Sequence, residues 1–140
     1  MKRKMLIGIA VVAVLVGVIA ACWIFRPAKA AQIAIVETNW SGEKDYEPTE
    51  QTITYEVKPG DVIQCGGMAD FEVTILKISN DSVTIETNMP MSSAQAPYVN
   101  LKTDETHFTI SKNESLRLVT PTLDAGDIYT FSILETGKER

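Results

Sequence analysis

The chain of 140 residues contains one histidine and two cysteines, and this shortage excludes several kinds of site. A zinc or copper site built from several histidines needs more than His107 alone. Cys22 lies in an apolar run near the N-terminus, so Cys65 has no partner in the rest of the chain for an internal disulfide. Because small secreted domains of eukaryotes usually carry disulfides, the shortage favours a bacterial surface protein.

The chain also lacks the local motifs of common enzyme classes. It has no Gly-x-Gly-x-x-Gly dinucleotide fingerprint, no phosphate-binding P-loop and no Gly-x-Ser-x-Gly nucleophile motif. Cys65 and His107 are the residue types of a nucleophile and its base, but nothing in the sequence places them together. We therefore expect a protein that is not an enzyme and that needs no cofactor.

The longest uncharged stretch is the apolar run Met5–Phe25, which has 21 residues. At about 1.5 Å per residue, a helix of this length covers roughly the 30 Å hydrocarbon core of a bilayer. Lys2, Arg3 and Lys4 precede the run, and this positive charge favours a cytoplasmic N-terminus. We expect residues 1–30 to be a single-pass membrane anchor or signal segment, and residues 31–140 to form one domain outside the cytoplasm.

Two other interpretations of the N-terminal segment stay open. The residues Ile19–Cys22 resemble the lipobox of bacterial lipoproteins, in which small residues precede a cysteine that is lipidated. That resemblance implies lipidation of Cys22. Alternatively, Ala28–Ala30 has the small-x-small pattern of a signal peptidase site, with cleavage after Ala30. All three interpretations place residues 31–140 on the outer side of the membrane.

Residues 31–140 are strongly acidic. Residues 1–30 hold five of the 13 Lys and Arg residues and none of the 18 Asp and Glu residues, which leaves a domain with 8 basic and 18 acidic residues and a net charge of −10. The field of such a domain repels nucleic acid and anionic lipid head groups. It attracts cationic peptides or divalent cations. We expect a protein partner in the cell envelope and no nucleic acid.

Alternating apolar and polar residues predict about eight short strands and no helix after residue 30. The predicted strands are Gln32–Val36, Thr52–Val57, Asp61–Cys65, Phe71–Ile78, Ser82–Thr87, His107–Ser111, Leu116–Thr120 and Ile128–Leu134. Turn signals every 8–12 residues are typical of an all-β antiparallel sandwich of immunoglobulin type. A small barrel or a jelly roll is the alternative.

Several turns can be predicted in more detail. The turn Lys58–Asp61 predicts a hairpin that joins the strands on either side of it. Asn80 and Asp81 predict a type I′ hairpin turn, and the change of phase near Ile75–Leu76 predicts either a β-bulge or burial of both strand faces. The residues Asp124–Gly126 followed by Tyr129 resemble the Asp-x-Gly-x-Tyr corner of immunoglobulin domains.

Two loops contain candidate site residues. The polar loop Asn39–Gln51 carries four acidic residues that are candidates for calcium ligands, because hard cations take several carboxylate oxygens. They are Glu43, Asp45, Glu47 and Glu50. The long loop Asn88–Thr106 carries Met89, Met91, Pro97 and Tyr98, which suit an adaptable surface for a partner. The alternative is a loop that folds back and buries these side chains over the edge of the sandwich.

The sequence therefore predicts a membrane-tethered β-sandwich that acts as a binding module for an envelope partner. Loops at the ends of a rigid sandwich are common recognition sites. One alternative is a structural accessory subunit of a larger membrane complex. The other is a lipoprotein that binds a small ligand or calcium.

Overall fold

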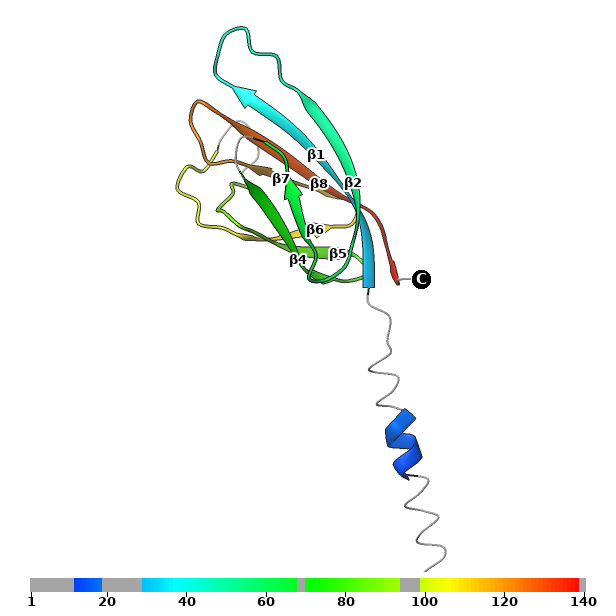
Figure 1. Ribbon diagram of the computed structural model, residues 1–140. Helices are drawn as coiled ribbons and strands as arrows, with labels where there is room; N and C mark the ends of the chain where they lie inside the picture. The colour runs from blue at the N-terminus through cyan, green and yellow to red at the C-terminus, as the bar shows by residue number, and fades with distance from the viewer. Residues whose placement is uncertain (1–11, 19–28, 68–69, 94–98, 139–140) are drawn as a thin grey trace, which may run out of the picture.

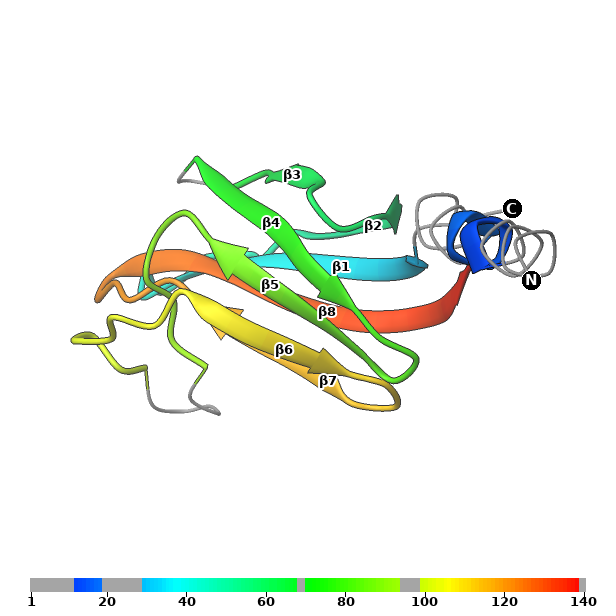
Figure 2. The same cartoon turned by 90° about the horizontal axis from the view of Figure 1, so that it is seen from below.

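The computed structural model describes residues 12–18, 29–67, 70–93 and 99–138. Its eight strands form two four-stranded antiparallel sheets (Figures 1 and 2). The first sheet has the order β2-β1-β8-β7, and the second has the order β3-β4-β5-β6. The strands are β1 (Lys29–Ser41), β2 (Glu50–Val57), β3 (Val62–Cys65), β4 (Phe71–Ile78), β5 (Ser82–Thr87), β6 (His107–Ser111), β7 (Ser115–Val119) and β8 (Ala125–Lys138).

One apolar core lies between the two sheets and confirms the predicted sandwich. The predicted inward positions Val73 and Ile85 of the second sheet are fully buried, as is Phe131 of the first sheet. Phe71 and Tyr129 join the sheets across the core, with ring centroids 4.4 Å apart. Alternation along most of the strands gives each sheet one buried face, and burial of these two faces against each other drives the packing.

The strands follow one another around the sandwich in chain order. Every strand lies beside a sequence neighbour in its own sheet, and β1 also pairs with β8, so the first and last strands lie side by side. The path changes sheet between β2 and β3 and between β6 and β7. Immunoglobulin domains instead use a Greek-key order that interleaves distant strands. The strand order of this protein differs from that pattern.

The turn Lys58–Asp61 does not form the predicted hairpin. β2 pairs with β1, and β3 pairs with β4. Gly60 follows Pro59 with a φ of 95°, and the Asp61 amide donates to the Lys58 carbonyl at 3.1 Å. This is the geometry of a type II turn, whose twist does not match that of a hairpin. The turn therefore leads the chain from one sheet to the other.

The hairpin β4–β5 forms as predicted, but its turn is not of type I′. Among the described non-glycine residues only Asn113 has a positive φ, so Asn80 and Asp81 lack the required conformation. The Ser79 hydroxyl holds the turn instead, 2.6 Å from the Ser82 hydroxyl. The predicted bulge is confirmed, because the pairing register shifts between Ile75 and Lys77.

The longest strands, β1 and β8, define two ends of the sandwich. Lys29 pairs with Lys138 at the end where residue 29 enters the domain (Figure 1). Trp40 pairs with Gly126 at the opposite end, which we call the distal end. β1 extends on both sides of the predicted strand Gln32–Val36, because β8 supplies pairing partners along its whole length.

The N-terminal segment contributes one short helix, residues 12–18, to the described structure. Within the described ranges, no helix has both the length and the apolar character that a bilayer crossing requires. Cys22 and the remainder of Met5–Phe25 lie outside these ranges, so lipidation and membrane insertion stay predictions.

Candidate binding groove

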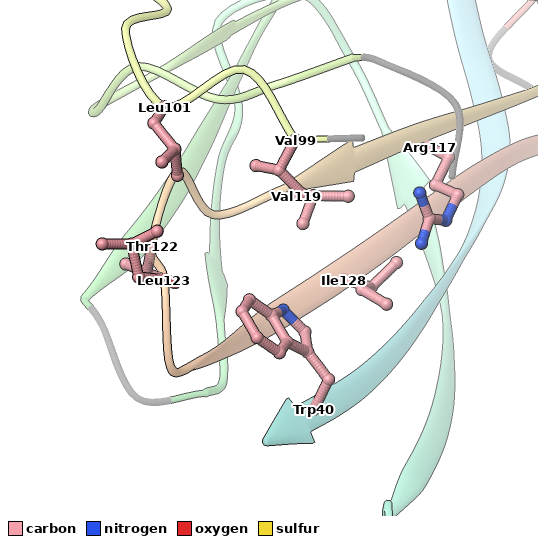
Figure 3. A pocket seen from close by; sticks show the side chains of 8 residues that line it. All are labelled: Trp40, Val99, Leu101, Arg117, Val119, Thr122, Leu123 and Ile128. Carbon is pink, nitrogen blue, oxygen red and sulfur yellow. The ribbon is translucent and has the colours of Figure 1, made fainter. Parts of the chain in front are cut away.

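An open groove of about 380 Å³ lies on the outer face of the first sheet at the distal end (Figure 3). Five segments build it: β1, β7, β8, the β7–β8 turn and the long loop between β5 and β6. The residues that line it are Trp40, Val99, Leu101, Arg117, Val119, Thr122, Leu123 and Ile128. Its volume lies at the lower end of the range for small-ligand pockets.

The floor of the groove follows from the alternation of β7. Leu118 points into the core and is fully buried, so its neighbours Arg117 and Val119 face outward. The backbone of Val119 exchanges two hydrogen bonds with Ser92, at 2.8 and 2.9 Å. The Ser92 hydroxyl accepts a further bond from the Asn100 amide at 2.9 Å. These bonds fix the long loop beside β7, where Val99 and Leu101 form one wall.

Trp40 forms the opposite wall because Gly126 leaves space for its ring. A Cβ atom at Gly126 would lie 2.9 Å from the indole Nε1 and 2.6 Å from the Thr122 hydroxyl oxygen, and it would also overlap the Thr120 hydroxyl. Within the described residues, the buried indole N–H has no hydrogen-bond acceptor. Glycine at this position therefore sets how closely the tryptophan packs on β8.

The groove combines exposed apolar groups with one positive charge. Leu123 is 76% exposed and Leu101 is 45% exposed at the rim. The half-buried Arg117 lies at one end of the groove, and its guanidinium forms no hydrogen bond or ion pair with the described residues. A guanidinium offers five donors in a planar fork that matches a carboxylate. The arrangement is suited to binding an apolar group next to an anion.

The first half of the long loop folds back over the sandwich. Met91 is fully buried in the core, and Met89 packs partly against it. The Met91 amide donates to the Glu105 carbonyl at 3.0 Å. This corresponds to the alternative in which the methionines are covered, and Met91 offers no surface to a partner. Pro97 and Tyr98 lie outside the described residues.

The four acidic residues proposed for calcium lie in or beside the loop between β1 and β2 and are all exposed. The described part of the chain contains no group of three or more His, Cys, Asp or Glu side chains that could hold a metal ion. Calcium binding by Glu43, Asp45, Glu47 and Glu50 stays a prediction without a preformed site.

A second cluster of polar groups lies where the sheets separate between β2 and β3. The Tyr129 hydroxyl donates to the Gly66 carbonyl at 2.6 Å. Burial, and next the charge of Asp127, raises the pKa of Glu37. Burial, and next the charge of Glu37, raises the pKa of Cys65 to about 12. Cys65 therefore holds its proton at neutral pH and is a poor nucleophile.

The structure does not bring Cys65 and His107 together as a nucleophile and its base. Cys65 lies on β3 and His107 on β6, which are opposite edges of the same sheet. The exposed His107 side chain points outward, and its Nε2 atom lies 3.5 Å from Oε1 of Glu86. Tyr129 bonds a residue 63 positions away and not the chain just before it, so the resemblance to an immunoglobulin tyrosine corner does not extend to its hydrogen bond.

One further spacing belongs to a nucleophile motif. Ser41 and Lys44 have the Ser-x-x-Lys spacing. Ser41 ends strand β1, and its hydroxyl accepts a bond from the Glu43 amide at 3.2 Å. Residues three apart face each other on a helix. This segment is not helical, so the spacing alone does not bring Ser41 and Lys44 face to face.

The sequence identified the long loop but not the groove. Arg117 is one outward residue of a short strand, and Leu101 and Leu123 are apolar residues in polar turns. The one signal for the groove in the sequence was the presence of apolar residues at turn positions, where polar residues are usual. No protein-family model, curated protein or solved structure matches the chain.

Proposed function

We propose that this chain is a binding module, tethered to a membrane by Met5–Phe25, that contacts a protein partner outside the cytoplasm through the distal groove. The observation that carries the proposal is the groove itself. Exposed leucines, a tryptophan and an arginine that has no counter-ion among the described residues gather on one face of an otherwise acidic domain. Contiguous exposed apolar groups on a stable domain are typical of interaction sites.

The chemistry of the groove defines the partner group that fits. Leu101, Leu123 and Trp40 would cover an apolar side chain, and Arg117 would pair with a carboxylate beside it. An ion pair in a half-buried groove is less screened by water than one on an open surface. The proposed ligand is therefore an apolar segment of a protein that carries an acidic side chain or a C-terminal carboxylate.

The position of the tether supports this arrangement. Three residues separate Phe25 from Lys29, where β1 begins, and β1 then runs to Ser41 at the distal end. At about 3.3 Å per residue, the end of β1 beside the groove lies about 40 Å from the first residue of the strand. Cleavage after Ala30 would remove the first two residues of β1, Lys29 and Ala30, which pair with Lys138 and Gly137, so an uncleaved chain keeps these two pairs.

Photo-crosslinking in intact cells tests the proposal. A photoreactive residue at Leu101 or Leu123 is expected to give one dominant protein adduct. Leu134 on β8 is the matched control, because it is 53% exposed and lies outside the groove. Arg117→Glu is expected to abolish the adduct. The same adduct from position 134, or an adduct that survives Arg117→Glu, would show that the groove is not the contact site.

A further inference from the structure

Strand β2 forms a long edge without a neighbour in the described structure. It pairs with β1 over eight consecutive positions, from Ala31 opposite Val57 to Thr38 opposite Glu50. The other three edges are short or covered. β3 has four residues and β6 has five, and β7 is bridged by Ser92. Figure 1 shows β2 along the margin of the molecule.

The hydrogen bonds of the β1–β2 pair show which backbone groups of β2 point outward. The Asn39 backbone N–H donates to the Thr49 carbonyl at 3.4 Å, and the Thr49 N–H donates to the Asn39 side-chain oxygen at 2.8 Å, so these two residues turn their backbone groups toward each other. Such pairs alternate along an antiparallel ladder, so the odd-numbered residues of β2 bond to β1. The N–H and C=O groups of Glu50, Thr52, Thr54 and Glu56 therefore point away from the sheet.

This edge lacks most of the features that usually prevent strand pairing. The segment Glu50–Val57 contains no proline and no lysine, and its register with β1 has no bulge. Ile53 is 38% exposed, and it lines a hollow between the sheets with Tyr55. A strand added to β2 would bond the outward backbone groups and cover these two side chains.

The charge around β2 defines what kind of strand it would accept. The β1–β2 hairpin holds six acidic side chains between Ala30 and Val57, with Lys44 as the one basic residue there. The acidic residues are Glu37, Glu43, Asp45, Glu47, Glu50 and Glu56. Pairing of two copies through β2 would bring two such acidic hairpins together. A cationic strand meets the opposite charge.

We propose that β2 binds an extended cationic segment of a protein partner as an additional strand of the first sheet. Backbone hydrogen bonds supply the affinity, and basic side chains beside Glu50 and Glu56 supply the preference for this partner. β2 and β7 are the opposite edges of the sheet, so this surface is separate from the groove and does not depend on the function proposed for it.

Hydrogen exchange of the full chain in detergent micelles tests the proposal. The probe is a short capped peptide of alternating valine and lysine, and its control has glutamate in place of lysine. The valine–lysine peptide is expected to slow exchange of the outward amides at positions 50, 52, 54 and 56 by at least about tenfold. The inward amides of β2 should not change. The glutamate peptide should protect none of them.

Two substitutions separate edge pairing from general charge attraction. Thr54→Pro removes an outward N–H without removing a bond to β1, and it is expected to weaken peptide binding at least about tenfold. Thr54→Val keeps the N–H and is expected to bind like the parent chain. The double change Glu50→Lys with Glu56→Lys keeps the backbone and is expected to weaken binding to a similar degree.

Four results with the peptides or the variants would overturn the proposal, and a fifth concerns the chain alone. The four are unchanged outward amides with the valine–lysine peptide, equal protection by the glutamate peptide, full binding by Thr54→Pro with a native exchange pattern, and full binding by the double lysine variant. Protection that appears without peptide and grows with protein concentration would identify a second copy as the occupant. That result would also overturn it.

Discussion

The two sheets differ in how they are built and in what their outer faces present. The β3–β6 sheet consists of consecutive strands, and β5 alternates strictly between buried and half-buried positions. The first sheet joins the first strand to the last, and its outer face carries Trp40, Val119 and Ile128. Figure 2 shows the two sheets as separate layers. A sheet with a polar outer face serves as a scaffold, whereas a sheet with an apolar outer face offers that face for binding a partner.

The largest expected effect comes from the core side of the scaffold sheet. Ile85 on β5 is fully buried, so Ile85→Ala removes packed methyl groups and leaves a cavity. We expect the free energy of unfolding to fall by about 2–5 kcal/mol. Ile128→Ala, on the half-buried groove floor, should cost roughly 1 kcal/mol and should weaken partner binding. Denaturant unfolding measures both losses, and equal losses would contradict the distinction between the core and the outer groove floor.

Two glycines of β8 give a matched test of the groove wall. A side chain at Gly126 would collide with Thr122 and Trp40, whereas a Cβ at Gly137 meets nothing within 4 Å. Gly126→Ala is expected to destabilise the fold by about 1–3 kcal/mol and to displace the tryptophan ring. Gly137→Ala should change stability by less than about 0.5 kcal/mol. Unfolding curves and the emission spectrum of Trp40, measured with Trp23→Phe in every chain, test the pair, and an unshifted spectrum in Gly126→Ala would contradict the packing argument.

The bond between Tyr129 and the β3–β4 connection links the two sheets near the open β2 edge. Tyr129→Phe removes the donor to the Gly66 carbonyl and is expected to cost about 1 kcal/mol in unfolding free energy. Tyr55→Phe is the control, because the Tyr55 hydroxyl forms no hydrogen bond with the described residues. It should have less than half that effect. Thermal unfolding of both variants decides whether the bond contributes.

The smallest expected effect depends on pH. The pKa of Glu37 lies above its ordinary value of 4.5 because of burial and then Asp127, so the folded state binds the proton more tightly than the unfolded state. Stability is therefore lost as the pH rises from the ordinary pKa through the raised one. Glu37→Gln should leave stability unchanged at pH 4 and raise it at pH 7. Because water screens this partly exposed group, the gain should be under about 1 kcal/mol. An equal gain at both pH values would contradict this assignment.

The inward faces of the strands were predictable because alternation alone decides them. Val73, Ile85 and Phe108 are buried as expected, and the bulge near Leu76 followed from the change of phase there. The connections were harder, because a Pro-Gly turn bends the chain whether or not the flanking strands pair. At Lys58–Asp61 the type II twist separates the strands, and long-range pairing with β1 and β4 determines the sheets.

The groove was not predictable because its residues are far apart in the sequence. Trp40, Val99 and Arg117 meet through the β1–β8–β7 ladder and the Ser92 bridge to Val119. None of these pairings has a local signal. The length of β1 was missed for the same reason, since Asn39 and Trp40 continue the strand by pairing with β8.

The pairing of the first strand with the last also sets the order of folding. Ribosomes add roughly 5–20 residues per second, so several seconds pass between the synthesis of β1 and that of β8. β1 can pair with β2 during this time, but its other side has no partner until β8 has been made. Contacts between distant segments also form slowly. The strand that carries Trp40 is therefore the one that depends longest on protection from aggregation in the newly made chain.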